Sequence, residues 1–343
     1  MSRLTIIALV LAAACGKTTP PPTAPLPEDK PAEPVVKPDE PAKPPAEPTV
    51  EPLEITIGAP DITVKLVKAG AGKKAKLAYV AGKGGEKVPV EFAFDIGQKA
   101  TTPKGPEEVI SPTIVLLTDA EVSASDEKTI GYTFSLNSID ARDVANQNVG
   151  TAQAIRDQIG ATTGLTIKGQ VGTNGVATGT TTVRIEKGDD AGKNIVNLVQ
   201  QAFPSWPALP QEALGTGAKW TATSKASLMG KLDLMQETTY ELVSRKGNVT
   251  TIKGTIKVSG TDAEIQGQKI TGVKGSGTVE ATLTDGQLPT FKTNMTTGFT
   301  VSDAANSATI DVRVGSSMTP KVAAAAAAPD AKGAPKAEAP AKK

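Results

Sequence analysis

The sequence predicts a mainly β protein of the α+β class. We expect one antiparallel, strongly curled sheet or half-barrel, with two short amphipathic helices inserted midway and a disordered tail on each side. Apolar and polar residues alternate in about a dozen runs between Ile55 and Val314, as in half-buried strands. Turn sequences such as Asn174-Gly175 and Asp285-Gly286 lie between runs and favour hairpins, which pair antiparallel. A dozen strands in one sheet cannot stay flat, so the sheet must coil or split.

Residues 1–14 are predicted to be a signal peptide. Arg3 supplies a positive charge, and an apolar run of 11 residues follows from Leu4 to Ala14. In a helix, such a run spans about 16 Å, which is too short for a bilayer core of about 30 Å. A charged start, a short apolar segment and small residues at its end are typical of a secretory signal peptide.

Cys15, the single cysteine of the chain, directly follows Ala12-Ala13-Ala14. This arrangement resembles the lipobox of bacterial lipoproteins, although the lipobox prefers Leu where this chain has Ala12. The resemblance implies that Cys15 becomes the acylated mature N-terminus. Several buried acyl chains, at ~0.8 kcal/mol per CH₂, would hold the protein on the cell envelope, at the periplasmic or surface face of the outer membrane. The alternative is ordinary cleavage after Ala14, which leaves a free thiol.

Residues 15–53 and 321–343 are predicted to be disordered. Thirteen of the 26 prolines fall between Thr18 and Leu53, among Ala, Glu and Lys. Proline removes backbone donors, and the segment has too little apolar surface to offset the entropy of ordering it. It is therefore predicted to be an extended spacer, at most roughly 110 Å long at about 3.1 Å per residue. The Ala/Pro/Lys segment 321–343 is predicted to be a second tail, which leaves 54–320 as the β-rich domain.

Two stretches of the domain have a helical rather than a strand pattern. In residues 151–161, Ile155 and Ile159 are four apart with polar residues between them. In residues 190–203, apolar residues recur on one face, an aspartate begins the segment and Pro204 follows it. Both stretches are predicted to be short amphipathic helices.

Composition excludes several kinds of site. The chain has no His and one Cys, so Ser-His-Asp triads, Cys-His dyads, His-based metal sites and internal disulfides cannot form. The predicted domain, residues 54–320, has 27 basic and 27 acidic residues. The other charges are Arg3, four Lys and seven acids in 16–53, and five Lys and two acids in 321–343. A balanced domain does not favour nucleic-acid binding. We expect no enzyme activity, no catalytic residues, no metal and no cofactor.

The densest signature follows the second predicted helix. It contains Trp206, then Leu209-Pro210, then Gly217-Ala218-Lys219-Trp220. This Leu-Pro, Gly-x-x-Trp pattern resembles that of an uncharacterised family of β-rich bacterial envelope lipoproteins, which brings no known activity with it. Trp220 begins an alternating pattern with Ala222, Ser224 and Ala226, so its face is expected to be buried in the core. The alternative is that the ring lines a ligand cavity, and Trp206 and Trp220 are therefore the candidate ligand-binding residues.

Two functional hypotheses follow. The first is a non-enzymatic binding or structural module of the envelope, tethered through Cys15 and able to meet an envelope protein. The second is a carrier for a lipid or other apolar ligand, because the expected sheet is similar in shape to the half-barrel of periplasmic lipoprotein carriers and acyl-binding lipoproteins. Apolar residues that face a core and those that face a ligand alternate in the same way, so the pattern fits both.

Overall fold

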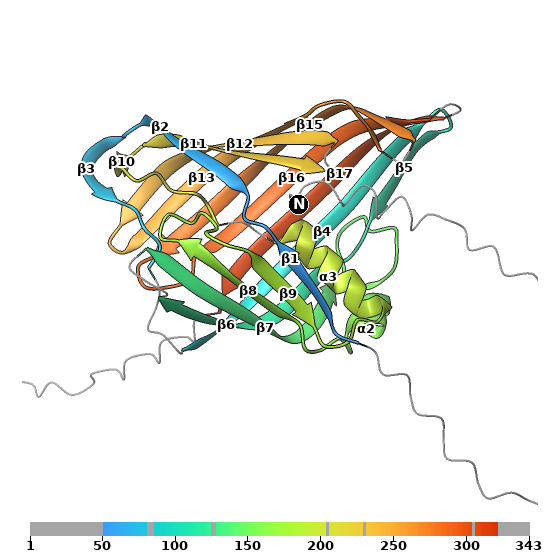
Figure 1. Cartoon of the computed structure of the whole chain (residues 1–343), viewed down its shortest axis with the longest axis horizontal. Coiled ribbons are helices and arrows are strands. Elements are labelled where there is room, and N and C mark those ends of the chain that lie inside the picture. The colour runs from blue at the N-terminus through green and yellow to red at the C-terminus, as the bar shows by residue number, and fades with distance from the viewer. Residues whose placement is uncertain are drawn as a thin grey trace, which may run out of the picture.

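The computed structural model describes residues 51–80, 86–124, 128–203, 206–228, 231–265, 267–303 and 306–321. The signal peptide, Cys15, almost all of the spacer and the tail after Lys321 therefore lie outside the described residues. Within these ranges the protein is mainly β, with a large antiparallel sheet and two helices, as predicted (Figure 1). No helix in the described ranges combines the length and the hydrophobicity that a bilayer crossing requires.

The described residues contain seventeen strands, more than the dozen expected, because short strands such as β3 and β14 carry little alternation. The strands and helices, in chain order, are β1 Leu53–Ile57, β2 Asp61–Lys68, β3 Ala71–Lys76, β4 Lys87–Thr102, β5 Gly105–Ile110, β6 Thr113–Ala124, β7 Thr129–Arg142, α2 Ala152–Ile159, β8 Thr166–Gly172, β9 Thr181–Ile185, α3 Asp190–Ala202, β10 Ala213–Thr216, β11 Lys219–Leu228, β12 Leu232–Lys246, β13 Val249–Gly260, β14 Ala263–Ile265, β15 Gln268–Thr284, β16 Thr290–Ser302 and β17 Ser307–Pro320.

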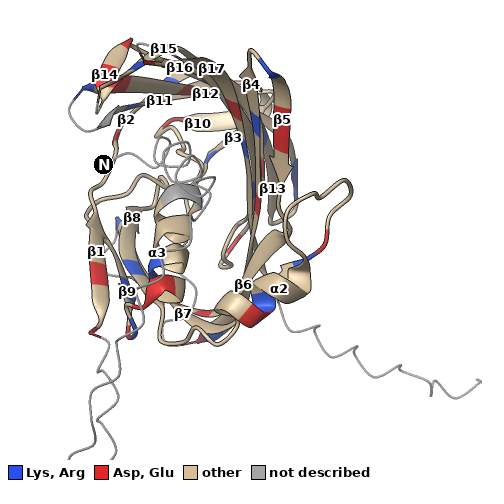
Figure 2. Ribbon diagram, turned by 90° about the vertical axis from the view of Figure 1, so that its right-hand side faces the viewer, with Lys and Arg blue, Asp and Glu red and all other residues tan. Residues whose placement is uncertain are grey.

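The main sheet is open. Its order is β1-β9-β8-β7-β6-β4-β17-β16-β15-β13-β12-β11-β2, with β14 and β5 paired at its side and β10-β3 forming a separate pair. The two edge strands, β1 and β2, are consecutive in the chain and are joined by residues 58–60 alone. Four Cα–Cα steps of 3.8 Å span at most about 15 Å. The sheet therefore bends until its two edges approach each other at one end, as Figure 2 shows.

The inner face of this bend holds the main core. Helix α3 lies inside the curve (Figure 2) and packs against β9, β1 and β17 through buried residues such as Ile195 and Val199. Phe203, directly after the helix, contacts Phe92 of β4 and Phe134 of β7 at ring-centroid distances of 5.2 and 5.9 Å. The residue that ends α3 thus packs on the aromatic side chains of two strands that flank β6.

Glycine on the inner face permits tight curvature. Gly254 of β13 lies opposite Tyr240 and Val279. A Cβ at this position would be 2.7 Å from Val279 Cγ1 and 3.0 Å from Tyr240 Cδ1. Only a residue without a side chain allows the neighbouring strands to approach so closely here.

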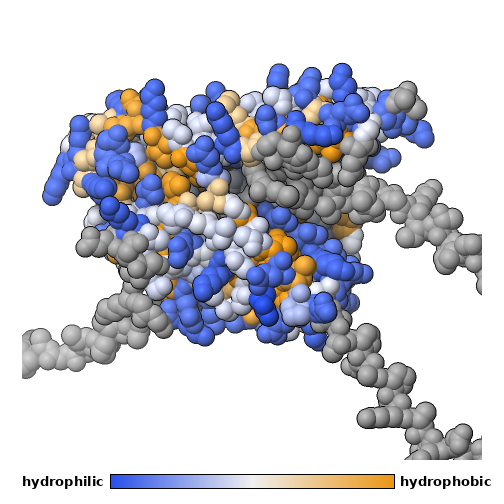
Figure 3. Space-filling view, viewed as in Figure 1, coloured by the Kyte–Doolittle hydropathy of each residue, from blue (hydrophilic) through white to orange (hydrophobic). Residues whose placement is uncertain are grey.

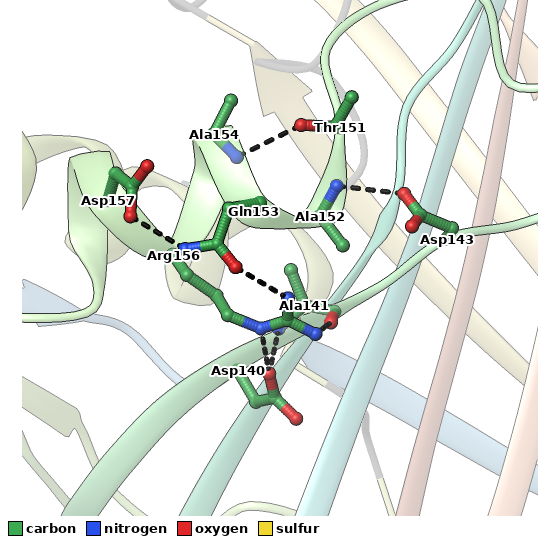
Figure 4. Close-up of polar contacts among 9 residues, drawn as sticks. All are labelled: Asp140, Ala141, Asp143, Thr151, Ala152, Gln153, Ala154, Arg156 and Asp157. Atoms are coloured by element: carbon green, nitrogen blue, oxygen red, sulfur yellow. Dashed lines mark hydrogen bonds and ion pairs between the residues drawn. The ribbon is translucent and has the colours of Figure 1, made fainter.

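Helix α2 is fastened to the end of β7 (Figure 4). The Thr151 side chain accepts a hydrogen bond from Ala154 N (3.1 Å), and Asp143 accepts one from Ala152 N (2.8 Å). Arg156 donates to Asp140 at 2.6 Å, and this hydrogen bond holds the pKa of the Asp140 carboxyl below its ordinary value. Both predicted helices are confirmed to within one or two residues at each end.

The hairpin prediction is confirmed at Gly286. It joins β15 to β16 with a positive φ of 74°, which glycine adopts without strain. The expected domain limits were 54 and 320. The first strand begins one residue earlier, at Leu53, where the backbone pairs with Ile185, and the last strand ends at Pro320.

Candidate functional site: a polar row on the inner face

Trp220 is a core residue at the α3 side of the sheet. Its side chain is 0% exposed, and its ring stacks on that of Tyr240 with centroids 5.5 Å apart. Its Nε1–H donates to the carbonyl oxygen of Ala208 at 2.8 Å. Ala208 directly precedes the buried Leu209, so this hydrogen bond ties the Leu-Pro segment to the Gly-x-x-Trp segment. The sequence signature is a packing unit that closes the core.

Trp206 is also buried, between two tyrosines. It meets Tyr79 edge-on at a centroid distance of 4.9 Å and stacks against Tyr132 at 6.3 Å. The Tyr79 hydroxyl donates to the Pro207 carbonyl at 2.9 Å. Burial raises the pKa of Tyr79 well above its ordinary value and raises the pKa of Tyr240 to about 12, so both phenols stay neutral. The two candidate tryptophans thus lie in one packed cluster, and Cys15, the third candidate, lies outside the described residues.

A second feature of the inner face lies further along the strands. Direct strand-to-strand pairing aligns one residue from each of nine strands, from β2 through β11, β12, β13, β15, β16, β17 and β4 to β5. These residues are Ile62, Ser224, Gln236, Val258, Gly275, Thr297, Val312, Gln98 and Val109. We call this line the polar row, because four of its members carry neutral polar side chains.

The polar row faces the inside of the bend. Directly paired residues of antiparallel strands point to the same face, and residues two apart on one strand do so as well. Ser224 is four residues from Trp220, Gln236 is four from Tyr240, and Gln98 is six from Phe92, all even steps. Trp220, Tyr240 and Phe92 belong to the main core beneath α3, so the polar row is on the same face.

Two polar atoms of the row have no partner. Thr297, at 9% exposure, has a buried Oγ1 without a hydrogen bond, and Gln98 has a buried Oε1 in the same condition, within the described part of the chain. By contrast, Gln236 donates from Nε2 to Thr238 Oγ1 at 3.4 Å. Leaving a buried polar group unpaired costs about 1–3 kcal/mol, and such groups are rare in native proteins. The two free atoms lie on β16 and β4, the strands on either side of β17.

The rows on both sides of the polar row are mainly apolar. Toward α3 the paired residues are Val64, Ala222, Thr238, Ile256, Gly277, Met295, Val314 and Ile96. Away from α3 they include Ala226, Leu234, Phe299, Ile310 and Ala100, beside a second buried cluster of Leu232, Leu234, Ile265, Ile270 and Val273. Several of these side chains, among them Ile96, Met295 and Phe299, are only partly buried. Four neutral polar groups therefore cross an apolar surface that is not fully covered.

The outer face of the same strands has a different character. Lysine, threonine and glutamate alternate along it, and ion pairs such as Lys253–Glu280 (2.8 Å) join neighbouring strands. An open, shallow depression there is lined by residues that include Lys274, Thr296 and Asp311. Seen from the side of the edge strand β1, the molecule shows hydrophilic side chains over much of the visible surface, with hydrophobic patches between them (Figure 3). Within the described ranges, no three His, Cys, Asp or Glu side chains are grouped closely enough to hold a metal ion.

Sequence reasoning missed the polar row, although one signal for it was present. The signal is a polar residue among the inward-facing residues of a strand, which are otherwise apolar or small. It occurs at Ser224, Gln236 and Thr297. Their alignment depends on the register of nine strands, which the sequence does not specify. A comparison with known protein families finds no match to this chain, and a comparison with curated protein sequences finds none either.

Proposed function

We propose that this protein is a non-enzymatic, membrane-tethered binding module of the bacterial cell envelope. The sequence supports the tether: a short signal peptide ends at the single cysteine, and a proline-rich spacer separates that cysteine from the β-rich domain. In this proposal Cys15 is acylated, and the spacer lets the domain work at a distance from the outer membrane that holds it.

The proposed ligand site is the inner face of the sheet, which would act as a half-barrel. The single observation that carries this proposal is the polar row, where Thr297 and Gln98 each present a buried, unpartnered polar atom beside partly buried apolar side chains. Unpaired buried groups lower stability, so their retention is understandable if a ligand pairs with them. The same observation favours the second candidate function, a carrier of a lipid or other apolar ligand, over a purely structural role. An envelope protein remains the other class of partner.

The division of the inner face supports this proposal. Toward one end, α3 lies inside the curve (Figure 2). Trp206 and Trp220 belong to the main buried core with aliphatic side chains of this helix. Beyond them, several residues of the rows on either side of the polar row, among them Ile96, Met295 and Phe299, are only partly buried. The packed core at one end fixes the positions of the strands, and the less covered end of the same strands can serve as the binding surface.

Two experiments test the proposed function. Cys15→Ser should abolish labelling with radioactive palmitate and release the protein from membranes, whereas unchanged membrane association would contradict the tether. Native mass spectrometry of the wild-type chain, extracted from its own cells, should show a bound small molecule at about one per protein. A spectrum of the apoprotein alone, together with stoichiometric capture of an envelope protein, would replace the carrier hypothesis with a protein-binding one.

A further inference from the structure

We propose that the polar row recognises the head of a neutral amphiphile: a lipid with an alkyl or acyl chain and an uncharged head that carries hydroxyl groups, such as a monoacylglycerol. This inference rests on the proposed function of the inner face and adds the chemical class of the ligand. Thr297 and Gln98 are assigned as the residues that contact the head.

The two free atoms require a hydrogen-bond donor. Gln98 Oε1 is a carbonyl oxygen and can only accept a hydrogen bond, whereas Thr297 Oγ1 can donate or accept. A ligand hydroxyl satisfies both, because it carries one proton and two lone pairs. An ionised carboxylate or a phosphate diester carries no proton to donate to Gln98. In this orientation the Gln98 amide oxygen pairs with a hydroxyl and not with the bare oxygens of an ionised carboxylate or phosphate.

Charge leads to the same class. The polar row contains no charged side chain, and neither does the row toward α3. Charged residues of the same strands, such as Lys99, Asp311 and Arg313, are at odd steps from Gln98 and Val312 and belong to the outer face. An ionised head against this wall would lose water without gaining a counter-charge, which is strongly unfavourable. The site therefore favours an uncharged head.

A glycine lies beside the threonine hydroxyl in the polar row. Gly275 is the residue of the row next to Thr297, and a Cβ placed on it would be 2.7 Å from Thr297 Oγ1 and 3.1 Å from Val258 Cβ. A side chain at this position would press against the threonine hydroxyl, and glycine avoids this contact. Thr297 and Gln98 are two strands apart, roughly 10 Å between backbones, and their side chains converge on the inside of a curved sheet. A head with two hydroxyl groups suits this separation, and the apolar rows on both sides can receive the chain.

The test compares two ligands that share one chain. Binding of 1-monooleoylglycerol and of oleate is measured on the full chain carrying Cys15→Ser, by competition with a fluorescent alkyl probe. Monooleoylglycerol should bind more tightly than oleate at pH 8, where the oleate head is ionised. Thr297→Val keeps the shape of the side chain and removes its hydroxyl, so it should weaken monooleoylglycerol binding roughly three- to tenfold and leave oleate unchanged.

Thr296→Val is the matched control. Thr296 is the preceding residue of β16 and is exposed on the outer face. The Thr296→Val variant should therefore bind both lipids as the wild type does. The thermal midpoint of the ligand-free Thr297→Val variant should not fall, because the hydroxyl that it loses has no partner, and this shows that any weaker binding is not unfolding. A Gln98→Met variant should repeat the selective loss.

The outcomes separate the two proposals. Equal affinity for both lipids, with no effect of Thr297→Val or Gln98→Met on either, would overturn the assignment of the head group while leaving a lipid-binding inner face. If the wild-type chain binds neither lipid and displaces no probe, the inner face is not a lipid site, and the carrier function fails together with this inference.

Discussion

Replacing Trp220 with alanine should remove the largest fully buried side chain of the described domain. The indole has three separate roles. It fills core volume opposite Leu66, stacks on Tyr240 with centroids 5.5 Å apart and donates from Nε1 to the Ala208 carbonyl at 2.8 Å. Alanine keeps none of these contacts, and it leaves the carbonyl of Ala208 without that donor.

The expected loss of unfolding free energy is about 4–5 kcal/mol. Removing a large aromatic from a core costs about 3–5 kcal/mol through lost burial and the residual cavity. The orphaned carbonyl, at about 1–3 kcal/mol, and the lost ring pair, at about 0.5–1.5 kcal/mol, place this site at the upper end, although the costs overlap and do not simply add. Trp220→Phe keeps most of the ring but not the donor, and should cost about 1–3 kcal/mol.

Urea titration followed by far-ultraviolet circular dichroism measures both variants. Met235→Ala is the control: Met235 is on a neighbouring strand and 44% exposed, so its loss should be within about 0.5 kcal/mol. A loss below about 1 kcal/mol for Trp220→Ala would refute the reasoning, because it would mean that the indole neither fills the core nor joins the two segments of the signature.

Three further predictions concern charge, burial and curvature. The hydrogen bond from Arg142, assisted by Lys321, lowers the pKa of Glu91. The ionised Glu91 carboxylate therefore stabilises the fold above the ordinary carboxyl range, and this stabilisation is lost as pH falls through the lowered pKa. Glu91→Gln should cost about 1 kcal/mol in urea unfolding at pH 7 and much less at pH 3, and an equal loss at both pH values would be inconsistent with this pairing. Burial raises the pKa of Tyr240 to about 12, so the stability of the fold should decrease as pH rises from about 10 toward 12. The difference in absorbance at 295 nm between the wild type and Tyr240→Phe should show no phenolate at pH 10.5. A phenolate signal at that pH would mean that the Tyr240 ring is not buried. Gly254→Ala should cost about 1–3 kcal/mol in the same unfolding assay, because its Cβ would overlap two side chains. Gly58→Ala is the control and should be neutral, because a Cβ there meets nothing within 4 Å. Equal effects of the two substitutions would argue against tight packing at Gly254.

Much of the fold could be predicted because its signals are local. Alternation marks the long strands, such as β4 and β17, and an aspartate N-cap with an apolar stripe marks α3 almost to the residue. The short strands escaped prediction. β3, with the sequence Ala-Gly-Lys-Lys-Ala-Lys, is exposed throughout and is held by its pairing with β10, a partner that is more than 130 residues away.

The candidate site could be predicted only in part. Trp206 and Trp220 stood out by composition, but a large apolar residue that fills a core and one that lines a site look alike until packing is known. The polar row arises from the register between strands: Gln98 and Thr297 are almost 200 residues apart, and only their common partner Val312 brings them to one level. A one-residue slip in any strand would move its member to the other face.

The central claim, that the inner face binds a ligand, is tested most directly by photo-crosslinking in living cells. A p-benzoylphenylalanine is placed at Gln236, which is on the inner face, or at its neighbour Met235, which is exposed on the outer face. After irradiation, mass spectrometry of the purified protein should show a covalently attached small molecule with the group at 236 and none with the group at 235. Equal capture at the two positions, or no adduct at 236 when the protein is folded, would contradict the account.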